Sequence, residues 1–243
     1  MGHSNESSSP LTEEEVRDFV ENKTAILEQK PDLNEEETKA AVITDFIQLL
    51  GWQIPLDGRI EYQFGEHNTN VVDYALLDNG VSKVFIEAKA PGISLEKHRS
   101  QITEYLALDS VELGVLTNGE VYEIYRTHIS NGDQVERQRV AQVELRDFVD
   151  HLDILNSLTK EEVSSGSYKE KLQRVVDFNN ARDALTEKRQ GLSRDIVNAV
   201  LVLWELSHRK LPENTYRTIW ITSMMNSNQR TKPHQRLWIR KQS

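Results

Sequence analysis

The sequence predicts an α/β protein with a mixed central sheet flanked by helices. Apolar residues recur at helical spacing up to Leu50, and strand-like alternation replaces this pattern from Ile54. A further helical segment then separates two groups of predicted strands, an order typical of α/β domains. The chain has 243 residues, which is enough for one domain with a sizeable core and a smaller appendage.

Two helices are predicted before the first strand. The first begins after Thr12, a good N-cap with Glu15 three residues later, and ends before Pro31. The second lies in "NEEETKAAVITDFIQLLGW", where Asn34 is the N-cap and Gly51 ends the helix.

The predicted sheet has two groups of strands joined through a helix. The sequences "DNG" and "TNG" mark turns between neighbouring strands, and a Pro-Gly pair breaks the chain before the helix. The predicted strands are residues 59–64, 70–77, 81–89, 111–117 and 121–126, and the helix is residues 94–108.

The pattern weakens after residue 127. Residues 129–134 predict a loop, residues 143–158 a helix, and residues 164–167 a linker. Residues 168–210 predict two helices that are interrupted near Gly191.

Three parts of the chain follow from these patterns: a disordered N-terminus at residues 1–11, an ordered domain at 12–160, and a helical region with a basic tail at 161–243. Residues 205–243 contain eight lysines and arginines and two acids, a net charge of +6, so the rest of the chain carries −16 of the total of −10. The tail is therefore either a phosphate contact or a solvated segment.

The composition limits the metal ligands and the cellular location that we expect. The chain has no cysteine, so any metal must be held by oxygen or imidazole ligands, which favours Mg²⁺. No segment approaches the roughly 20 consecutive apolar residues of a membrane span, and the N-terminus lacks a secretory signal. We therefore expect a soluble cytoplasmic protein without a membrane partner.

Charged residues interrupt two apolar strands. In "KVFIEAK" the side chains of Glu87 and Lys89 point to the same face, and Asp73 lies within the apolar run "NVVDYALL". Burying charges costs several kcal/mol each unless they pair or bind an ion. These residues are therefore candidates for a functional site.

The turn between the two strands decides whether the two acids meet. If Asn79 and Gly80 alone form a two-residue loop, Asp73 faces Ile86 and the acids lie on opposite faces of the sheet. A loop of three or five residues changes the parity and brings Asp73 and Glu87 together.

A shared face would form a metal site. Asp73, Glu87 and the carbonyl group of Ala88 would bind Mg²⁺, for which Mn²⁺ is a possible substitute, and a substrate phosphate would complete the ligands. Lys89 would orient or deprotonate the attacking water, or steady the phosphate.

The pattern of an Asp, a hairpin and Glu-x-Lys resembles the PD-(D/E)xK nuclease superfamily. The segment "VVDYALLDNGVSKVFIEAKAPG" is similar to the N-terminal nuclease domain of type I restriction enzyme R subunits, and the resemblance covers roughly residues 32–150. It implies a restriction-endonuclease-like core, continued here by a helical C-terminal region.

The resemblance also implies further site residues. The family's first helix contributes a glutamate, for which Glu36 is the better match and Glu37 the rival. Gln101 and Tyr105 resemble the Q-x-x-x-Y motif of RecB-like nucleases, which positions substrate. No P-loop motif occurs, so ATP-driven translocation is not expected of this chain alone.

The predicted function is Mg²⁺-dependent hydrolysis of phosphodiester bonds in DNA by a restriction-modification endonuclease. Its partners would be DNA and a helicase, translocase or other restriction or defence subunit. Cutting both strands of a duplex usually requires two active sites, so a homodimer is one open possibility. The alternatives are a non-catalytic nucleic-acid-binding module and a protein-interaction module on the same fold.

Overall fold

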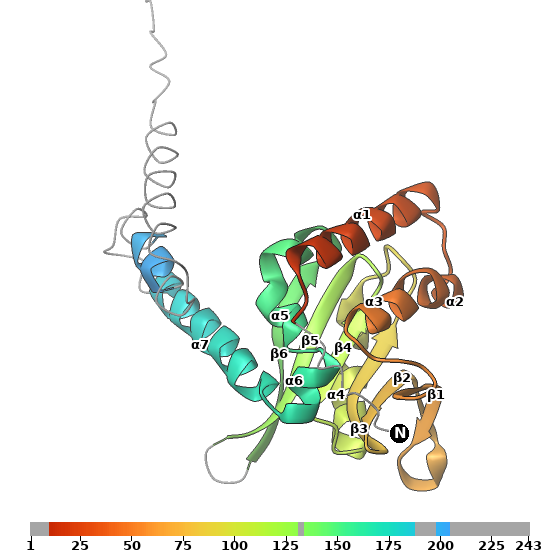
Figure 1. The fold of residues 1–243 in the computed structure, drawn as a ribbon. Coiled ribbons are helices and arrows are strands. Elements are labelled where there is room, and N and C mark those ends of the chain that lie inside the picture. The colour runs from red at the N-terminus through yellow and green to blue at the C-terminus, as the bar shows by residue number, and fades with distance from the viewer. Residues whose placement is uncertain (1–9, 131–133, 188–197, 205–243) are drawn as a thin grey trace, which may run out of the picture. The chain divides into compact units, whose positions relative to one another are not determined.

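The computed structural model describes residues 10–130, 134–187 and 198–204 (Figure 1). The chain divides into two compact units, Met1–Val176 and Asp177–Ser243, which are described separately.

The first unit is built on a six-stranded sheet with the strand order β1-β2-β3-β4-β5-β6. Only β3 and β4 pair in parallel, and the other neighbouring strands are antiparallel. A parallel pair needs a crossover, and helix α4 (Arg99–Leu108) provides it. The strands are Gly58–Phe64, Asn70–Asp78, Val81–Ala88, Leu113–Thr117, Val121–Ser130 and Gln134–Glu144.

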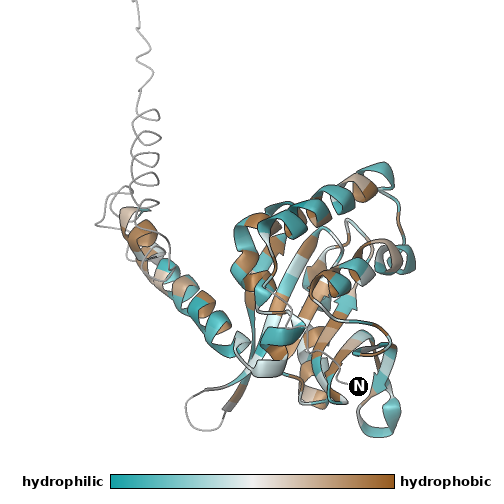
Figure 2. Cartoon of the chain, viewed as in Figure 1, coloured by the Kyte–Doolittle hydropathy of each residue, from teal (hydrophilic) through white to brown (hydrophobic). Residues whose placement is uncertain are grey.

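Helices cover both faces of this sheet. One hydrophobic core lies between the sheet and the helices that precede β1 and follow β6, and it contains Phe46, Ile86 and Phe148. The second core lies between the sheet and α4, and it contains Phe85 and Ile102. Figure 2 shows the apolar character of the central strands. The predicted α/β fold, with a mixed sheet flanked by helices, is thereby confirmed.

The N-terminal helices begin where their capping residues predict. Helix α1 (Glu13–Gln29) has a complete capping box between Thr12 and Glu15, and α2 (Glu35–Thr38) has one between Asn34 and Glu37. Helix α2 continues through the π-helical turn η1 (Lys39–Ile43) into α3 (Thr44–Leu49).

The hairpin between β2 and β3 combines a two-residue loop with a β-bulge. Asn79 and Gly80 both have positive φ angles, and Asp78 pairs with Val81. The register then shifts, because Leu77 pairs with Ser82 whereas Leu76 pairs with Val84. Lys83 is the extra residue of the bulge.

This bulge overturns the predicted consequence of a two-residue loop. Tyr74, rather than Asp73, pairs with Ile86. The same register, continued by one residue beyond the pair of Tyr74 and Ile86, places Asp73 opposite Glu87. The expectation that a two-residue loop separates the acids is wrong because an additional residue in β3 restores the parity.

The region after residue 127 holds an additional strand. Residues 129–134, predicted as a loop, include the end of β5 and the start of β6, which continues to Glu144. Residues 143–158 are helical only from Leu145, in a 3₁₀ segment and in α5 (Leu152–Asn156).

The chain after α5 also packs on the first core. Helix α6 (Lys160–Ser165) ends at Gly166, which adopts the left-handed conformation typical of a helix C-terminus. Helix α7 (Tyr168–Glu187) follows directly, and Val163 and Leu172 belong to the core cluster. The segment predicted as a linker, residues 164–167, is therefore the last turn of α6 and a tight turn before α7.

The described part of the second unit is helical. It comprises the end of α7 and residues 198–204, and Phe178 packs against Trp204 with ring centroids 4.8 Å apart. The interruption predicted near Gly191 and the basic tail lie outside the described residues. Within the described ranges no helix is long and apolar enough to cross a membrane.

Candidate active site

The candidate active site lies where the first half of β2 meets the end of β3, between α2 and α4. The structure brings together the acids Asp73 and Glu87, the lysine Lys89 and the α4 residue Gln101. A buried lysine from η1 joins them. These residues come from four separate elements of the chain, so the site exists only in the folded domain.

Asp73 is held by two hydrogen bonds. Its Oδ1 accepts from Lys39 Nζ at 2.9 Å, and its Oδ2 accepts from the backbone N–H of Ala88 at 2.7 Å. The second bond ties the carboxylate of β2 to the end of β3, next to Glu87.

Glu87 is the most buried acid of this site. Its Oε1 accepts from Lys89 Nζ at 2.9 Å and from Gln101 Nε2 at 3.0 Å. Its Oε2 is buried without a hydrogen-bond partner among the described residues. Burial raises the pKa of Glu87, the nearby charge of Asp73 raises it further, and the contact with Lys89 only partly opposes this. The site therefore favours an additional positive charge near Oε2.

Lys89 lies between two carboxylates. Its Nζ is 2.9 Å from Glu87 Oε1 and 3.5 Å from Glu35 Oε2. Burial lowers the pKa of Lys89, but the hydrogen bond to Glu87 and the charges of Glu87 and Glu35 outweigh burial and raise it. Lys89 is therefore protonated at neutral pH in this arrangement, which favours an orienting role over deprotonation of water.

The glutamates of α2 have three different contacts. Glu37 closes the capping box of its own helix, so the rival candidate is engaged in local structure. Glu36 is largely exposed and pairs with Lys39. Glu35 reaches Lys89. The better sequence match, Glu36, thus joins the site through Lys39, whereas Glu35 contacts the Glu-x-Lys motif directly.

Lys39 is a site residue that the sequence analysis did not identify. Its side chain is buried and pairs with both Asp73 and Glu36. Burial lowers its pKa, but the hydrogen bonds to Glu36 and Asp73 dominate together and raise it. A lysine on a helix normally indicates a solvated face, so only the contact with Asp73 reveals this position.

The two predicted α4 residues act as one unit. Gln101 Nε2 donates to Tyr105 Oη at 2.9 Å as well as to Glu87. The ring of Tyr105 meets Phe64 edge to face at a centroid distance of 5.0 Å. Gln101 therefore contacts the acid pair, and Tyr105 positions Gln101 while packing against the second core.

The acid pair fits a divalent cation. Asp73 and Glu87 supply carboxylate oxygens, and Glu87 Oε2 is a buried acceptor without a protein partner in the described part of the chain. One or two carboxylates are the usual protein share of a Mg²⁺ site, since water and phosphate supply the other ligands. The described residues contain no cluster of three or more acids or histidines arranged for a metal, so a protein-only cage is not present there.

One family model matches the central part of the chain. Residues 59–133 match the model of the family described as type I restriction enzyme R protein N terminus. The match includes Asp73, Glu87, Lys89, Gln101 and Tyr105. It confirms the resemblance to nucleases of this type for the central part of the chain, and it supports a restriction-type, nuclease-like role.

A solved structure gives a second comparison. A chain of the DrdV–DNA complex, determined by cryo-electron microscopy, is 20% identical with a TM-score of 0.41, and the alignment covers 60% of this chain and 97% of that chain. A search of curated proteins gave no match.

Proposed function

We propose that this protein is a Mg²⁺-dependent endonuclease that hydrolyses phosphodiester bonds in DNA. The observation that carries the proposal is the meeting of Asp73, Glu87 and Lys89, with the buried Glu87 Oε2 left without a hydrogen-bond partner among the residues that the structure describes. The pKa of Glu87 is raised because its burial and the nearby charge of Asp73 outweigh the contact with Lys89. Mn²⁺ would occupy the same oxygen ligands.

Each residue of the candidate site would have a separate role in the reaction. Asp73 and Glu87 would hold the cation, with the Ala88 carbonyl as a further ligand, and bound Mg²⁺ would polarise the phosphate and make water more acidic. Lys89 would hold the attacking water by donating to its oxygen. Attack of the water would form one phosphorus–oxygen bond and break the bond to the departing oxygen, while the water releases a proton to solvent and the departing oxygen takes one up from solvent.

Supporting residues would keep this arrangement fixed. Lys39 holds Asp73, Gln101 holds Glu87, and Glu35 holds Lys89. Such partners commonly change metal affinity or activity by about 10–100-fold when they are removed. Glu36 would act indirectly through Lys39.

The biological setting is part of the proposal. A restriction-type role in the cytoplasm would require DNA as substrate and a motor or other restriction subunit as partner, since the sequence has no P-loop. Cleavage of both strands of a duplex would require a second active site, which a homodimer would supply.

The test is cleavage of labelled single-stranded, duplex and forked DNA with Mg²⁺ or Mn²⁺. Asp73→Asn and Lys89→Ala should each lower the cleavage rate by at least about 100-fold. Lys169→Ala is the matched control, because Lys169 is exposed and pairs with Glu112 outside the site. Metal-dependent products that persist in both site variants would refute the proposal.

A further inference from the structure

A second charged cluster faces α4 two strands away from Glu87. In the sheet register Glu87 pairs with Leu116, and Leu116 pairs with Glu123. Neighbouring strands are about 4.8 Å apart, so Glu123 lies about 10 Å from Glu87 across the sheet. Both acids contact α4, Glu87 through Gln101 and Glu123 through Arg99. The two clusters therefore lie on the same side of the sheet.

Glu123 is a buried anchor for two arginines. Its carboxylate is only 1% exposed, and it accepts from Arg99 Nη2 at 2.7 Å and from Tyr125 Oη at 2.7 Å. Arg139 from β6 also donates to it. Burial raises the pKa of Glu123, but its hydrogen bonds to Arg99, Tyr125 and Arg139 together lower it. Glu123 is therefore ionised at neutral pH and holds both guanidinium groups.

The two arginines are still open to solvent. Their side chains are 40% and 37% exposed, respectively. Arg99 bonds Glu123 through Nε and Nη2, and Arg139 uses Nη1 for Glu123 and Gln142. Arg99 Nη1 and Arg139 Nη2 make no hydrogen bond within the described residues. Each guanidinium thus keeps donors for an outside acceptor.

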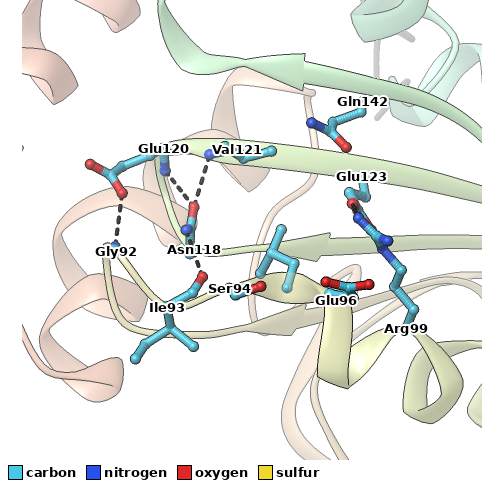
Figure 3. Close-up of a pocket in the computed structure, with 11 residues that line it drawn as sticks. Gly92, Ile93, Ser94, Glu96, Arg99, Asn118, Glu120, Val121, Glu123 and Gln142 are labelled. Carbon is cyan, nitrogen blue, oxygen red and sulfur yellow. Dashed lines mark hydrogen bonds and ion pairs between the residues drawn. The ribbon is translucent and has the colours of Figure 1, made fainter.

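A pocket of about 370 Å³ lies beside Arg99 (Figure 3). Glu123 and Gln142 line it at the Arg99 end. Glu120 lies at the other end, where it accepts from Gly92 N–H at 2.8 Å. Glu96 also lies near Arg99 and reduces the positive charge there. A ligand would therefore be held by directed hydrogen bonds from fixed guanidinium groups rather than by a broad positive field.

We infer that Arg99 and Arg139, fixed by Glu123, form a contact site for the phosphate backbone of DNA beside the catalytic residues. This inference rests on the proposed nuclease function and names where the bound strand runs. Successive nucleotides of one strand rise about 3.4 Å along the duplex axis and also turn around it, so a separation of about 10 Å places this contact within about three nucleotides of the scissile phosphate. Guanidinium groups suit phosphate oxygens because of their planar pairs of donors.

The experiment measures binding of fluorescein-labelled duplex and single-stranded DNA by anisotropy across a salt series, with Ca²⁺ in place of Mg²⁺. Arg99→Ala and Arg139→Ala should each weaken binding by about three- to tenfold and reduce the salt slope by about 0.7–0.9. Arg99→Lys and Arg139→Lys keep the charge and should keep most of the slope. Arg146→Ala should match the wild type, because Arg146 pairs with Glu28 outside this cluster.

Two results would overturn the inference without touching the nuclease proposal. One is an unchanged salt slope in both alanine variants of a protein that still cleaves DNA with metal. The other is an equal loss of the salt slope in the alanine and lysine variants, which would indicate a defect of packing around Glu123. Absence of both DNA binding and cleavage in the wild type would refute the nuclease proposal together with this inference.

Discussion

Asp73 accepts a hydrogen bond from the backbone N–H of Ala88 at 2.7 Å, which joins the first half of β2 to the end of β3 beside Glu87. This contact depends on the strand register, and the register depends on the bulge at Lys83. A single extra residue in β3 therefore reconciles a two-residue turn with an acid pair at one site.

Deletion of Lys83 should be tolerated. Without this residue Val84 would follow Ser82 directly. Ser82 would still pair with Leu77 and Val84 with Leu76, so the strand register would be kept and Asp73 would remain opposite Glu87. We expect cleavage within about threefold of the wild type and a cooperative thermal transition.

Deletion of Phe85 is the contrasting change. In this variant Asp73 could remain opposite Glu87 only if Lys83 moved into the position of Val84. That position is buried in the first core, where the charge of a lysine is unfavourable. This variant should fail to fold. If the Lys83 deletion fails equally, the bulge has a structural role beyond parity.

The glutamates of α2 should separate activity from stability. Glu35→Gln weakens the hold on Lys89 and should lower cleavage by about 10–100-fold with little change in the free energy of unfolding. Glu37→Ala breaks the capping box and should cost about 1 kcal/mol of stability while cleavage is retained.

Cleavage rates and urea unfolding of the two variants provide the comparison. Glu36→Gln is the intermediate case, because Glu36 reaches the site only through Lys39. A loss of cleavage in Glu37→Ala but not in Glu35→Gln would reverse the assignment.

Metal-free Glu87→Gln should be more stable than the wild type at pH 8. The pKa of Glu87 is raised in the folded protein, so ionisation of Glu87 disfavours the folded state. The wild type therefore loses stability relative to Glu87→Gln as the pH rises through that pKa. We expect a Tm increase of about 2–4 °C in EDTA at pH 8, which disappears near pH 4, below the ordinary carboxyl pKa.

Thermal unfolding with and without Mg²⁺ gives the control for this variant. Added Mg²⁺ should stabilise the wild type more than Glu87→Gln, because ligand binding stabilises only the folded state that binds it. A Tm below the wild-type value at pH 8 in EDTA would show that the contacts of Glu87 with Lys89 and Gln101 outweigh its burial.

The N-terminal helices and the order of the first five strands could be predicted from local signals. Thr12 and Asn34 mark helix starts whatever the tertiary structure. Strand β6 could not be predicted because its sequence "QVERQRVAQVE" is mostly polar, as suits an edge strand that is open to solvent.

Some residues of the candidate site could also be predicted from the sequence, whereas others depend on tertiary contacts. Asp73, Glu87 and Lys89 stand out because they interrupt apolar strands. The choice between Glu35 and Glu36 depends on the direction of a helix face, since consecutive residues differ by about 100° around the axis. The burial of Lys39 and the bulge at Lys83 arise from contacts that sequence spacing does not encode.

The most direct test of the account is the number of Mn²⁺ ions bound, measured by electron paramagnetic resonance for the wild type, Asp73→Asn and Glu87→Gln. We expect the wild type to bind Mn²⁺ at this site and both substitutions to abolish or strongly weaken this binding while the fold is kept. Equal Mn²⁺ binding by all three proteins would contradict the central claim that Asp73 and Glu87 form one metal site.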